Sequence, residues 1–588
     1  MTIHSKLAVA TIAALAAFSY SGSSAETQAQ TPAHLERWRS GMTLRERIAQ
    51  LVVIPFYGDL PGPKSAEHKR FLHLVAESRV GGLILVNRVQ NGIAKNAEPH
   101  EMASFINRMQ KVTKVPLIVA GDFERGASMR VSGTTKWPHN MAFGAARDYE
   151  ASHAQGAYTA EEARALGVHW VFAPDADVNN NPANPIISIR SYGENPQEVA
   201  SHVRSYIEGA RSAVHPVLVT AKHFPGHGDT AVDSHVGLPR LEMARTRMEE
   251  VEFTPFRAAI DAGVDAIMTA HMSVPALDPS DTPATVSHAI LTGVLRKELG
   301  FQGIVVTDAM DMQGLTKILP GGEAAVRAIE AGADVLLMPP DPDVAVAAVL
   351  KAVNSGRISR QRIEESLERV LAAKLRVGLG ENSLVDLKNI SRVVNSPESQ
   401  DLAQQVAGRA ITLVKNQDDI LPLENPASAC HFILSESRLG QSGRKLAELM
   451  PKELPGASWH RFTPATPAAE LSKAAKKAAA CKAVVLYAFV SVAAYRGNVA
   501  LAGGYPKFVE QLIAGPAPVV MVSLGNPYLL SSFPDVAAYL NTYSTAPTSE
   551  VAALKAIKAE IPIEGHLPVT IPDIAPQGAG IPLPARLQ

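Results

Sequence analysis

Short apolar runs alternate with helix-like segments from about residue 40 to about residue 380. The runs are rich in Val, Ile and Leu, and they do not alternate polar with apolar positions, which is typical of parallel strands buried on both faces. They predict eight strands, at 51–56, 82–86, 116–120, 168–173, 217–221, 266–270, 304–307 and 334–338.

The segments between these runs have helical periodicity. In 99–112, the apolar side chains of Met102, Phe105 and Met109 fall on one face of a helix. Strands that alternate with helices in this way predict an α/β fold, a (β/α)8 TIM-type barrel whose functional groups follow the C-terminal ends of the strands. Similar helical patterns occur in 197–212, 243–262, 288–299 and 323–331.

A second region of alternating pattern begins near residue 400, after a polar stretch. It predicts a smaller α/β sandwich domain over 400–588, joined to a barrel domain over 35–380 by a linker over 381–399. The helical segment of this region that stands out is 468–480. The predicted strands are 411–414, 431–434, 483–489, 519–524 and 536–541.

The first 25 residues have the pattern of a secretory signal peptide. Lys6 precedes an uncharged apolar run over 7–18, and the small residues 23–25 offer a cleavage site. The run is short for a membrane span, although an uncleaved anchor is the alternative. We therefore expect an exported protein, periplasmic or extracellular, whose mature chain has no membrane span.

The charge balance indicates which classes of binding partner are favoured, and the cysteine content bears on disulfide formation. The 588 residues include 56 Lys and Arg against 57 Asp and Glu, so no charge excess favours nucleic acid or an anionic membrane, and a small ligand fits better. Cys430 and Cys481 are the only cysteines of the chain. Export would allow them to pair, but the sequence leaves open whether they form a disulfide or remain two buried thiols.

Ionisable residues follow five successive predicted strands. Turns usually favour Gly, Asn, Ser and Pro, so this series indicates a functional site at the mouth of the barrel. In chain order the residues are Asp122, Asp175 and Asp177, Lys222 and His223, His271, and Asp308.

The densest group of polar residues is the loop 222–235, which contains three His, two Asp and a Lys. Three interpretations remain open. Asp233 and His235 are two residues apart and can form an acid/base pair in which the carboxylate orients the imidazole. Alternatively, His223, His227, Asp229 and His235 bind a divalent metal, although their spacing matches no known pattern. In the third interpretation the loop is a structural hydrogen-bonded plug.

The residues Lys222-His223-Phe224-Pro225-Gly226-His227-Gly228-Asp229-Thr230, with Asp233-Ser234-His235, resemble the signature loop of β-N-acetylglucosaminidases of glycoside hydrolase family 3. Segments 179–193, 304–310 and 410–423 are similar to other parts of the same family. The resemblance covers essentially the whole mature chain and includes the family's C-terminal α/β sandwich domain.

The resemblance implies a retaining hydrolase of terminal β-linked N-acetylhexosamine that needs no cofactor and no metal. Asp308 matches the nucleophile, His235 the general acid/base and Asp233 its partner. This arrangement departs from the usual pair of carboxyl groups, because a histidine replaces one of them. The positions that match sugar-binding residues are Asp122, Arg130, Arg190, Lys222 and His223.

One segment departs from the family. Where the family commonly has Asp-Gln-Glu-Gly-Gly, this chain has Asp122-Phe123-Glu124-Arg125-Gly126, and Arg130 keeps its distance from the motif. The bulk of Phe123 and Arg125 is expected to reshape the sugar pocket or a neighbouring subsite.

Several alternatives stay open at this point. The same fold could act as a phosphorylase, with phosphate in place of water, or as a β-glucosidase. Metal-dependent hydrolysis and a non-catalytic sugar-binding protein are alternatives of other classes. The sequence does not decide between peptidoglycan fragments and chitin oligosaccharides, between N-acetylglucosamine and N-acetylgalactosamine, or among oligomeric states.

Overall fold

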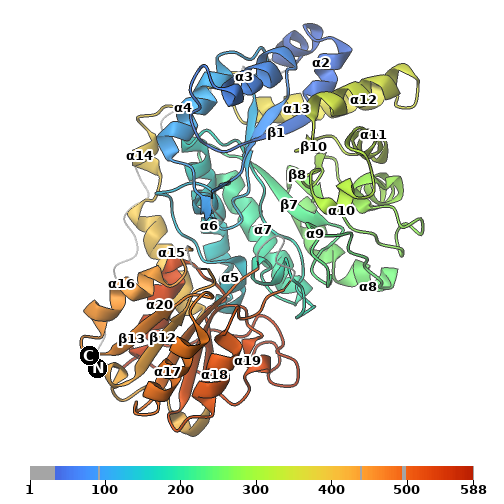
Figure 1. Ribbon diagram of the computed structural model, residues 1–588. Helices are drawn as coiled ribbons and strands as arrows, with labels where there is room; N and C mark the ends of the chain where they lie inside the picture. The colour runs from blue at the N-terminus through green and yellow to red at the C-terminus, as the bar shows by residue number, and fades with distance from the viewer. Residues whose placement is uncertain (1–32, 91–92, 438–439, 493–497, 587–588) are drawn as a thin grey trace, which may run out of the picture.

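The computed structural model describes residues 33–586, apart from 91–92, 438–439 and 493–497. The predicted signal peptide, residues 1–25, lies outside the described residues. The chain forms two bodies that lie against each other, a barrel drawn from blue to yellow and a second domain in orange and red (Figure 1). Among the described residues, no helix combines the length and apolar character needed to cross a membrane.

The first body confirms the predicted barrel. Its strands follow the order β10-β1-β2-β5-β6-β7-β8-β9, and every neighbouring pair is parallel. A bridge between Val306 and Val335 joins the ends of this series and closes the barrel. The strands are β1 (Val52–Phe56), β2 (Gly82–Leu85), β5 (Ile118–Gly121), β6 (Trp170–Val171), β7 (Leu218–Phe224), β8 (Ala266–Thr269), β9 (Ile304–Val306) and β10 (Leu336–Leu337).

Helices surround the barrel (Figure 1). The single helix predicted over 243–262 is divided into two helices by a turn at Val251 and Glu252. The segment predicted over 288–299 is helical, but as the π-helix η5 (Ala289–Glu298). The α-helices are α2 (Leu44–Ala49), α3 (Ala66–Leu72), α4 (Pro99–Gln110), α5 (Asn140–Ala146), α6 (Tyr149–Ala165), α7 (Pro196–Ser212), α8 (Arg245–Glu250), α9 (Phe253–Asp261), α10 (Gln313–Thr316), α11 (Gly321–Ala331), α12 (Pro342–Asn354) and α13 (Arg360–Arg376).

The second body is the α/β sandwich domain, built on a six-stranded sheet of order β11-β16-β15-β14-β12-β13. β11 is antiparallel to β16, and the other pairs are parallel. Its elements are β11 (Thr412–Asn416), β12 (Cys430–Leu434), β13 (Ser458–Phe462), β14 (Val484–Val490), β15 (Val519–Gly525), β16 (Ala538–Asn541), α16 (Arg444–Glu453), α17 (Ala468–Ala478), α18 (Tyr505–Ile513), α19 (Leu529–Ser532) and α20 (Pro547–Ile557).

The two bodies share a packed boundary. Between α13 and α15 (Pro397–Arg409) the chain contains only the short α-helix α14 (Ile390–Val393). Met141 and Ala142 of the barrel helix α5 pack into the apolar core of the sandwich domain. The amide of Asn179, which follows β6, donates to the hydroxyl of Tyr528 at 2.9 Å. The sandwich domain is therefore packed against the mouth-forming loops of the barrel.

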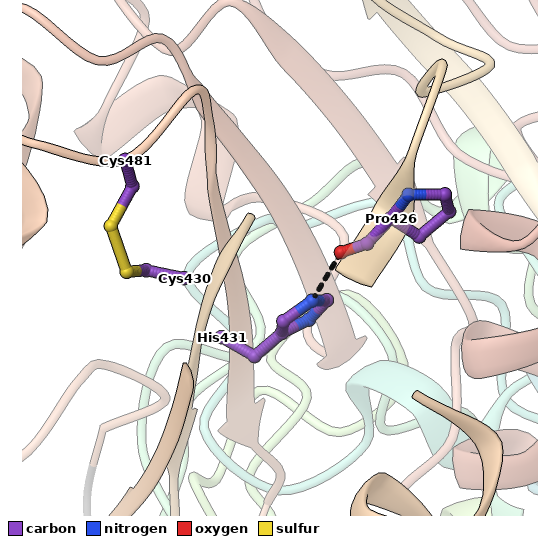
Figure 2. Close-up of a disulfide and its surroundings, with 4 residues drawn as sticks. All are labelled: Pro426, Cys430, His431 and Cys481. Carbon is purple, nitrogen blue, oxygen red and sulfur yellow. Dashed lines mark hydrogen bonds between the residues drawn. A yellow bond between two sulfur atoms is a disulfide. The ribbon is translucent and has the colours of Figure 1, made fainter. Parts of the chain in front are cut away.

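The two cysteines form a disulfide within the sandwich domain (Figure 2). Cys430 opens β12 and Cys481 lies in the segment between α17 and β14, so the bond joins a strand to the chain that follows a helix, with a Cα–Cα distance of 5.9 Å. Beside it, the His431 ring donates from Nε2 to the carbonyl of Pro426 at 2.9 Å. The structure thus pairs the two thiols whose state the sequence leaves open.

Candidate active site

A cavity of about 330 Å³ lies at the C-terminal mouth of the barrel. The predicted site residues that it brings together span 186 positions of the chain, from Asp122 to Asp308. Asp233 does not line the cavity itself, but it is hydrogen-bonded to His235, which does. The predicted site residues that line the cavity are Asp122, Arg130, Arg190, Lys222, His223, His235 and Asp308.

Strand β7 is longer than its apolar run predicts. It continues through Phe224, so Lys222 and His223 lie within the strand and not in the loop beyond it. All seven residues of the strand are buried. Asp175 pairs with Lys222 as a further bridge between neighbouring chain segments. Both polar side chains line the cavity from within the strand.

Asp308 follows β9 with only Thr307 between them, close to the strand end that the barrel pattern predicts. Its Oδ1 accepts the backbone N–H of Ala309 at 2.7 Å. Burial alone would raise the pKa of Asp308, but the imidazoles of His223, His271 and His235 hold it below its ordinary value. Asp308 is therefore a carboxylate at neutral pH, aimed into a confined space.

His271, just after β8, contacts the backbone of the segment that carries Asp308. It is fully buried, and its ring nitrogens lie 2.8 Å from the hydroxyl of Thr285 and 2.9 Å from the carbonyl of Ala309. Burial lowers the pKa of His271 below its ordinary value. The polar residue predicted at the sixth strand end thus holds the backbone next to Asp308 and does not line the cavity.

Asp233 and His235 form the contact that their spacing suggests. Asp233 Oδ1 accepts both the ring Nδ1–H of His235 at 2.8 Å and its backbone N–H at 2.9 Å. The Asp233 side chain is 1% exposed and the His235 side chain 25% exposed. A buried carboxylate that binds Nδ1–H fixes the tautomer and directs proton exchange to Nε2.

The loop that carries His235 is shaped by internal hydrogen bonds. Asp177 Oδ1 accepts the backbone N–H groups of His223 and His227, and the ring of His227 contacts the hydroxyls of Thr230 and Ser234 at 2.8 and 3.0 Å. Burial lowers the pKa of His227 to about 4. The ring is therefore neutral, and it serves as a hydrogen-bonded brace inside the loop.

The same loop is tied to the segment that follows Asp308. Gly314 N–H donates to the carbonyl of Ser234 at 3.1 Å, and Lys317 Nζ donates to the carbonyl of Val236 at 2.8 Å. A Cβ at position 314 would lie 2.7 Å from the Ser234 oxygen, so this approach requires glycine. The loop of the predicted acid/base and the segment of the predicted nucleophile are thus joined directly.

A charged network forms one side of the cavity. Lys222 Nζ lies 3.0 Å from Asp122 and 2.7 Å from Glu124, and Arg190 binds both oxygens of Glu124 at 2.8 and 2.9 Å. Arg130 contacts the other oxygen of Asp122 at 3.0 Å. Burial alone would lower the pKa of Lys222, but the carboxylates raise it above its ordinary value. These paired charges present fixed donors and acceptors for hydroxyl groups.

Asp175 lies beneath this network and is fully buried. Burial and the charge of Glu124 raise its pKa well above the ordinary value, which favours its neutral form. Its Oδ1 accepts from Arg190 at 3.3 Å, and its Oδ2 has no hydrogen-bond partner among the described residues. Arg190 therefore contacts both acidic side chains, and its contact with Glu124 at 2.8 Å is the shorter one.

The geometry does not favour the alternative interpretation of the loop 222–235 as a metal site. Both nitrogens of His227 are engaged by hydroxyls, and Asp229 lies 3.7 Å from the guanidinium of Arg247. The candidate cluster that the described residues contain is a different one, Asp175, Asp177 and His223. There, His223 Nδ1 already contacts Asp177 at 2.8 Å and Arg190 contacts Asp175, so a cation would face a guanidinium. In both groups, ligand atoms that a metal would need are already engaged by other side chains.

The segment that departs from the family enters the cavity through Glu124, which sequence reasoning did not select as a site residue. Phe123 is buried and Arg125 is partly exposed, and neither lines the cavity. In the chain, Glu124 lies between the predicted site residues Asp122 and Arg130. That position is the sequence feature that could have identified it as a site residue. Met338, after β10, and Val492, from the sandwich domain, also line the cavity. Only the packing of the two domains brings Val492 there.

Comparison with known proteins places this architecture among described enzymes. A beta-hexosaminidase A from Pseudoalteromonas piscicida is 32% identical over 69% of this chain and 73% of its own length. A beta-N-acetylglucosaminidase/beta-glucosidase from Cellulomonas fimi is 28% identical over 80% of this chain and 86% of its own length. The solved structure of a glycoside hydrolase family 3 beta-N-acetylglucosaminidase from a Paenibacillus species aligns with a TM-score of 0.78 at 32% identity, covering 90% of this chain and 99% of that chain.

The family model that matches is the N-terminal domain of glycosyl hydrolase family 3, over residues 43–373. This range contains all eight barrel strands and every predicted site residue. The chain belongs to glycosyl hydrolase family 3.

Proposed function

We propose that this protein is a retaining glycoside hydrolase that removes terminal non-reducing β-linked N-acetylhexosamine, with N-acetylglucosamine as the preferred sugar. The observation that carries the proposal is one cavity lined by both Asp308 and His235, with Asp233 fixed behind the imidazole. Relatives of this family that carry beta-hexosaminidase names support the choice of sugar.

The proposed reaction is a double displacement. The Asp308 carboxylate attacks the anomeric carbon while Nε2 of protonated His235 transfers its proton to the departing glycosidic oxygen. A covalent glycosyl ester on Asp308 results. Neutral His235 then removes a proton from water, which attacks the anomeric carbon and releases the sugar and the Asp308 carboxylate.

The charged network supplies sugar recognition in this proposal. Lys222 pairs with both Asp122 and Glu124 within 3.0 Å, so the orientations of the three side chains are fixed within the protein. Buried, pre-oriented charged groups discriminate hydroxyl configurations because a wrong epimer leaves one of them without its partner. Arg190 and Arg130 extend the same recognition surface.

We further propose that the protein acts outside the cytoplasm. The pattern of residues 1–25 supports export, and a disulfide between Cys430 and Cys481 is typical of proteins that mature in an oxidising compartment. Oligosaccharides from peptidoglycan or chitin would be met there, and both can end in N-acetylglucosamine.

The test is release of nitrophenol from the p-nitrophenyl N-acetyl-β-D-glucosaminide beside the matching β-glucoside, each with and without a chelator. Hydrolysis of the N-acetyl substrate that is indifferent to chelator is the expected result. Cleavage of the glucoside alone would contradict the proposed substrate, and loss of activity on chelation would contradict the proposed mechanism. Measuring sugar 1-phosphate with added phosphate tests water as the acceptor.

A further inference from the structure

The loop 222–235 makes close backbone contacts with two neighbouring segments. A Cβ at position 226 would lie 2.6 Å from Cγ of Glu252, a residue of the turn between α8 and α9 that is 1% exposed. A Cβ at position 228 would lie 1.8 Å from the carbonyl oxygen of Val178, in the segment that follows β6. Glycine at both positions therefore allows the loop to touch the α8–α9 turn and the segment after β6 at the same time.

Arg247, in α8, contacts all three of these segments. Its Nη1 donates to both carboxylate oxygens of Glu252, at 2.8 and 2.9 Å. Its Nη2 lies 3.7 Å from Oδ2 of Asp229, in the loop. With the Asn180 amide oriented so that its nitrogen donates to the carbonyl of Val178 at 2.7 Å, the amide oxygen accepts from Arg247 at 3.1 Å. One guanidinium thus joins the loop to both of its neighbours.

The charge of Arg247 compensates two carboxyl groups. Burial raises the pKa of Glu252 to about 7, and the guanidinium opposes this rise. Burial also raises the pKa of Asp229, and Arg247 again opposes the rise. A planar guanidinium can bind both oxygens of one carboxylate and still offer donors to other partners, whereas a lysine ammonium has no such fork. The three contacts therefore depend on arginine at this position.

The contact at Asp229 lies in the part of the loop that leads to His235. Thr230 is the next residue, and its hydroxyl lies 2.8 Å from one ring nitrogen of His227. The other nitrogen of that ring lies 3.0 Å from the hydroxyl of Ser234, which directly precedes His235. A displacement of Asp229 is therefore passed through Thr230 and the His227 ring to the residue beside the imidazole.

We propose that Arg247 is a positioning residue for the acid/base, and that it holds the loop so that the His235 imidazole stays aligned with the departing oxygen of the substrate. This inference rests on the proposed hydrolase function. Arg247 does not line the sugar cavity, so it acts through the loop and not on the sugar. Its removal should therefore impair proton transfer more than sugar binding or nucleophilic attack.

Two substrates that share the cleaved sugar separate these steps. N,N′-Diacetylchitobiose loses a sugar whose oxygen must be protonated, whereas N-acetyl-β-D-glucosaminyl fluoride loses an ion that departs without a proton. The quantity measured is the ratio of kcat/KM for the disaccharide to kcat/KM for the fluoride. In Arg247→Met this ratio should fall about tenfold relative to the unaltered protein, because a small misalignment of a proton donor slows the transfer. Arg247→Lys keeps the charge but not the fork, so its ratio should lie between the two.

Arg245→Met is the matched control, because Arg245 also lies in α8 but pairs with Glu249 and Glu298, which are both outside the loop. Its ratio should equal that of the unaltered protein. An unchanged ratio in Arg247→Met would overturn the proposal, and so would a parallel fall for both substrates, which would assign Arg247 to the fold alone. If the unaltered protein cleaves neither substrate, the hydrolase function itself fails, and this result is distinct from failure of the positioning role.

Asp229→Asn provides the same comparison from the loop side of the contact, and it decides the question if Arg247→Met does not fold. The Asp229 side chain is 32% exposed, and the substitution keeps its shape while it removes the charge that faces Arg247. The ratio should fall about threefold, in keeping with a partly exposed ion pair. Unchanged ratios in both Asp229→Asn and Arg247→Lys would overturn the proposal.

Discussion

One oxygen of the Asp233 carboxylate holds His235 at two points, the ring Nδ1 at 2.8 Å and the backbone N–H at 2.9 Å. The two bonds fix the imidazole relative to its own backbone, so the ring cannot rotate without breaking one of them. A carboxylate in this position also stabilises the imidazolium that precedes proton donation. The pair is therefore a single proton-handling unit.

Replacing Asp233 by Asn should lower kcat/KM for N,N′-diacetylchitobiose about 10²- to 10⁴-fold, because the imidazole loses its orienting anion. The loss should be much smaller for N-acetyl-β-D-glucosaminyl fluoride, since fluoride departs without a proton. Steady-state kinetics on both substrates measure this difference. Equal losses on the two would show that Asp233 acts on the fold of the loop and not on proton transfer.

Replacing Asp308 by Ala should lower turnover about 10⁴-fold, because the vacated position leaves no group to form the glycosyl ester. Added azide should enter the vacated space and attack the anomeric carbon of the fluoride substrate, giving an α-glycosyl azide that NMR identifies. Near-unaltered activity in Asp308→Ala would refute the nucleophile, and a β-configured azide would refute the geometry of attack.

Lys374 makes stability depend on pH. It is fully buried in α13, its Nζ donates to Gln50 at 2.7 Å, and burial lowers its pKa to about 7 from an unfolded value near 10.5. Between these values the unfolded chain binds more protons, so stability should rise as pH increases from about 7 to about 10.5. Lys374→Met removes this dependence.

Melting temperatures of both proteins across pH 7 to 10 measure the effect. The advantage of Lys374→Met over the unaltered protein should be largest near pH 7 and shrink toward pH 10. Loss of the partner of Gln50 shifts this difference by a constant and leaves its slope intact. A difference that does not vary with pH would contradict a lowered pKa for Lys374.

Removing the disulfide should destabilise the sandwich domain. The bond closes a separation of 51 residues, and the double variant Cys430→Ser, Cys481→Ser should lose about 3 to 4 kcal/mol of unfolding free energy, seen as a lower Tm. A reductant should lower the Tm of the unaltered protein and leave the double variant unchanged. Equal sensitivity of both proteins to reductant would exclude the disulfide as the cause.

The barrel could be predicted from sequence because its strands are buried on both faces. Such strands are continuous apolar runs in the sequence, as in 304–307. The polar residues that follow each run can then be placed at the mouth of the barrel from the sequence alone. β13 (Ser458–Phe462) was missed for the opposite reason. It is an edge strand with one face toward solvent, so Trp459 and Arg461 alternate with exposed residues and form no apolar run.

The site residues also divide into those that the sequence could predict and those that it could not. Asp308 was predictable because it lies just past the end of a buried strand, and the same rule placed Asp122. Glu124 was visible only as a neighbour of Asp122, since its role depends on the meeting of Lys222 and Arg190 in space. Val492 had no local signal, because the packing of one domain on the other determines what it touches.

The hydrogen bonds from Gly314 to Ser234 and from Lys317 to Val236 join the loop of His235 to the chain that leaves Asp308. A motion that withdraws the imidazole must therefore either break both bonds or carry residues 313–317 with it. The two bonds thereby tie the position of the proton donor to that of the chain that carries the nucleophile. A substitution that displaces one segment should therefore also displace the other.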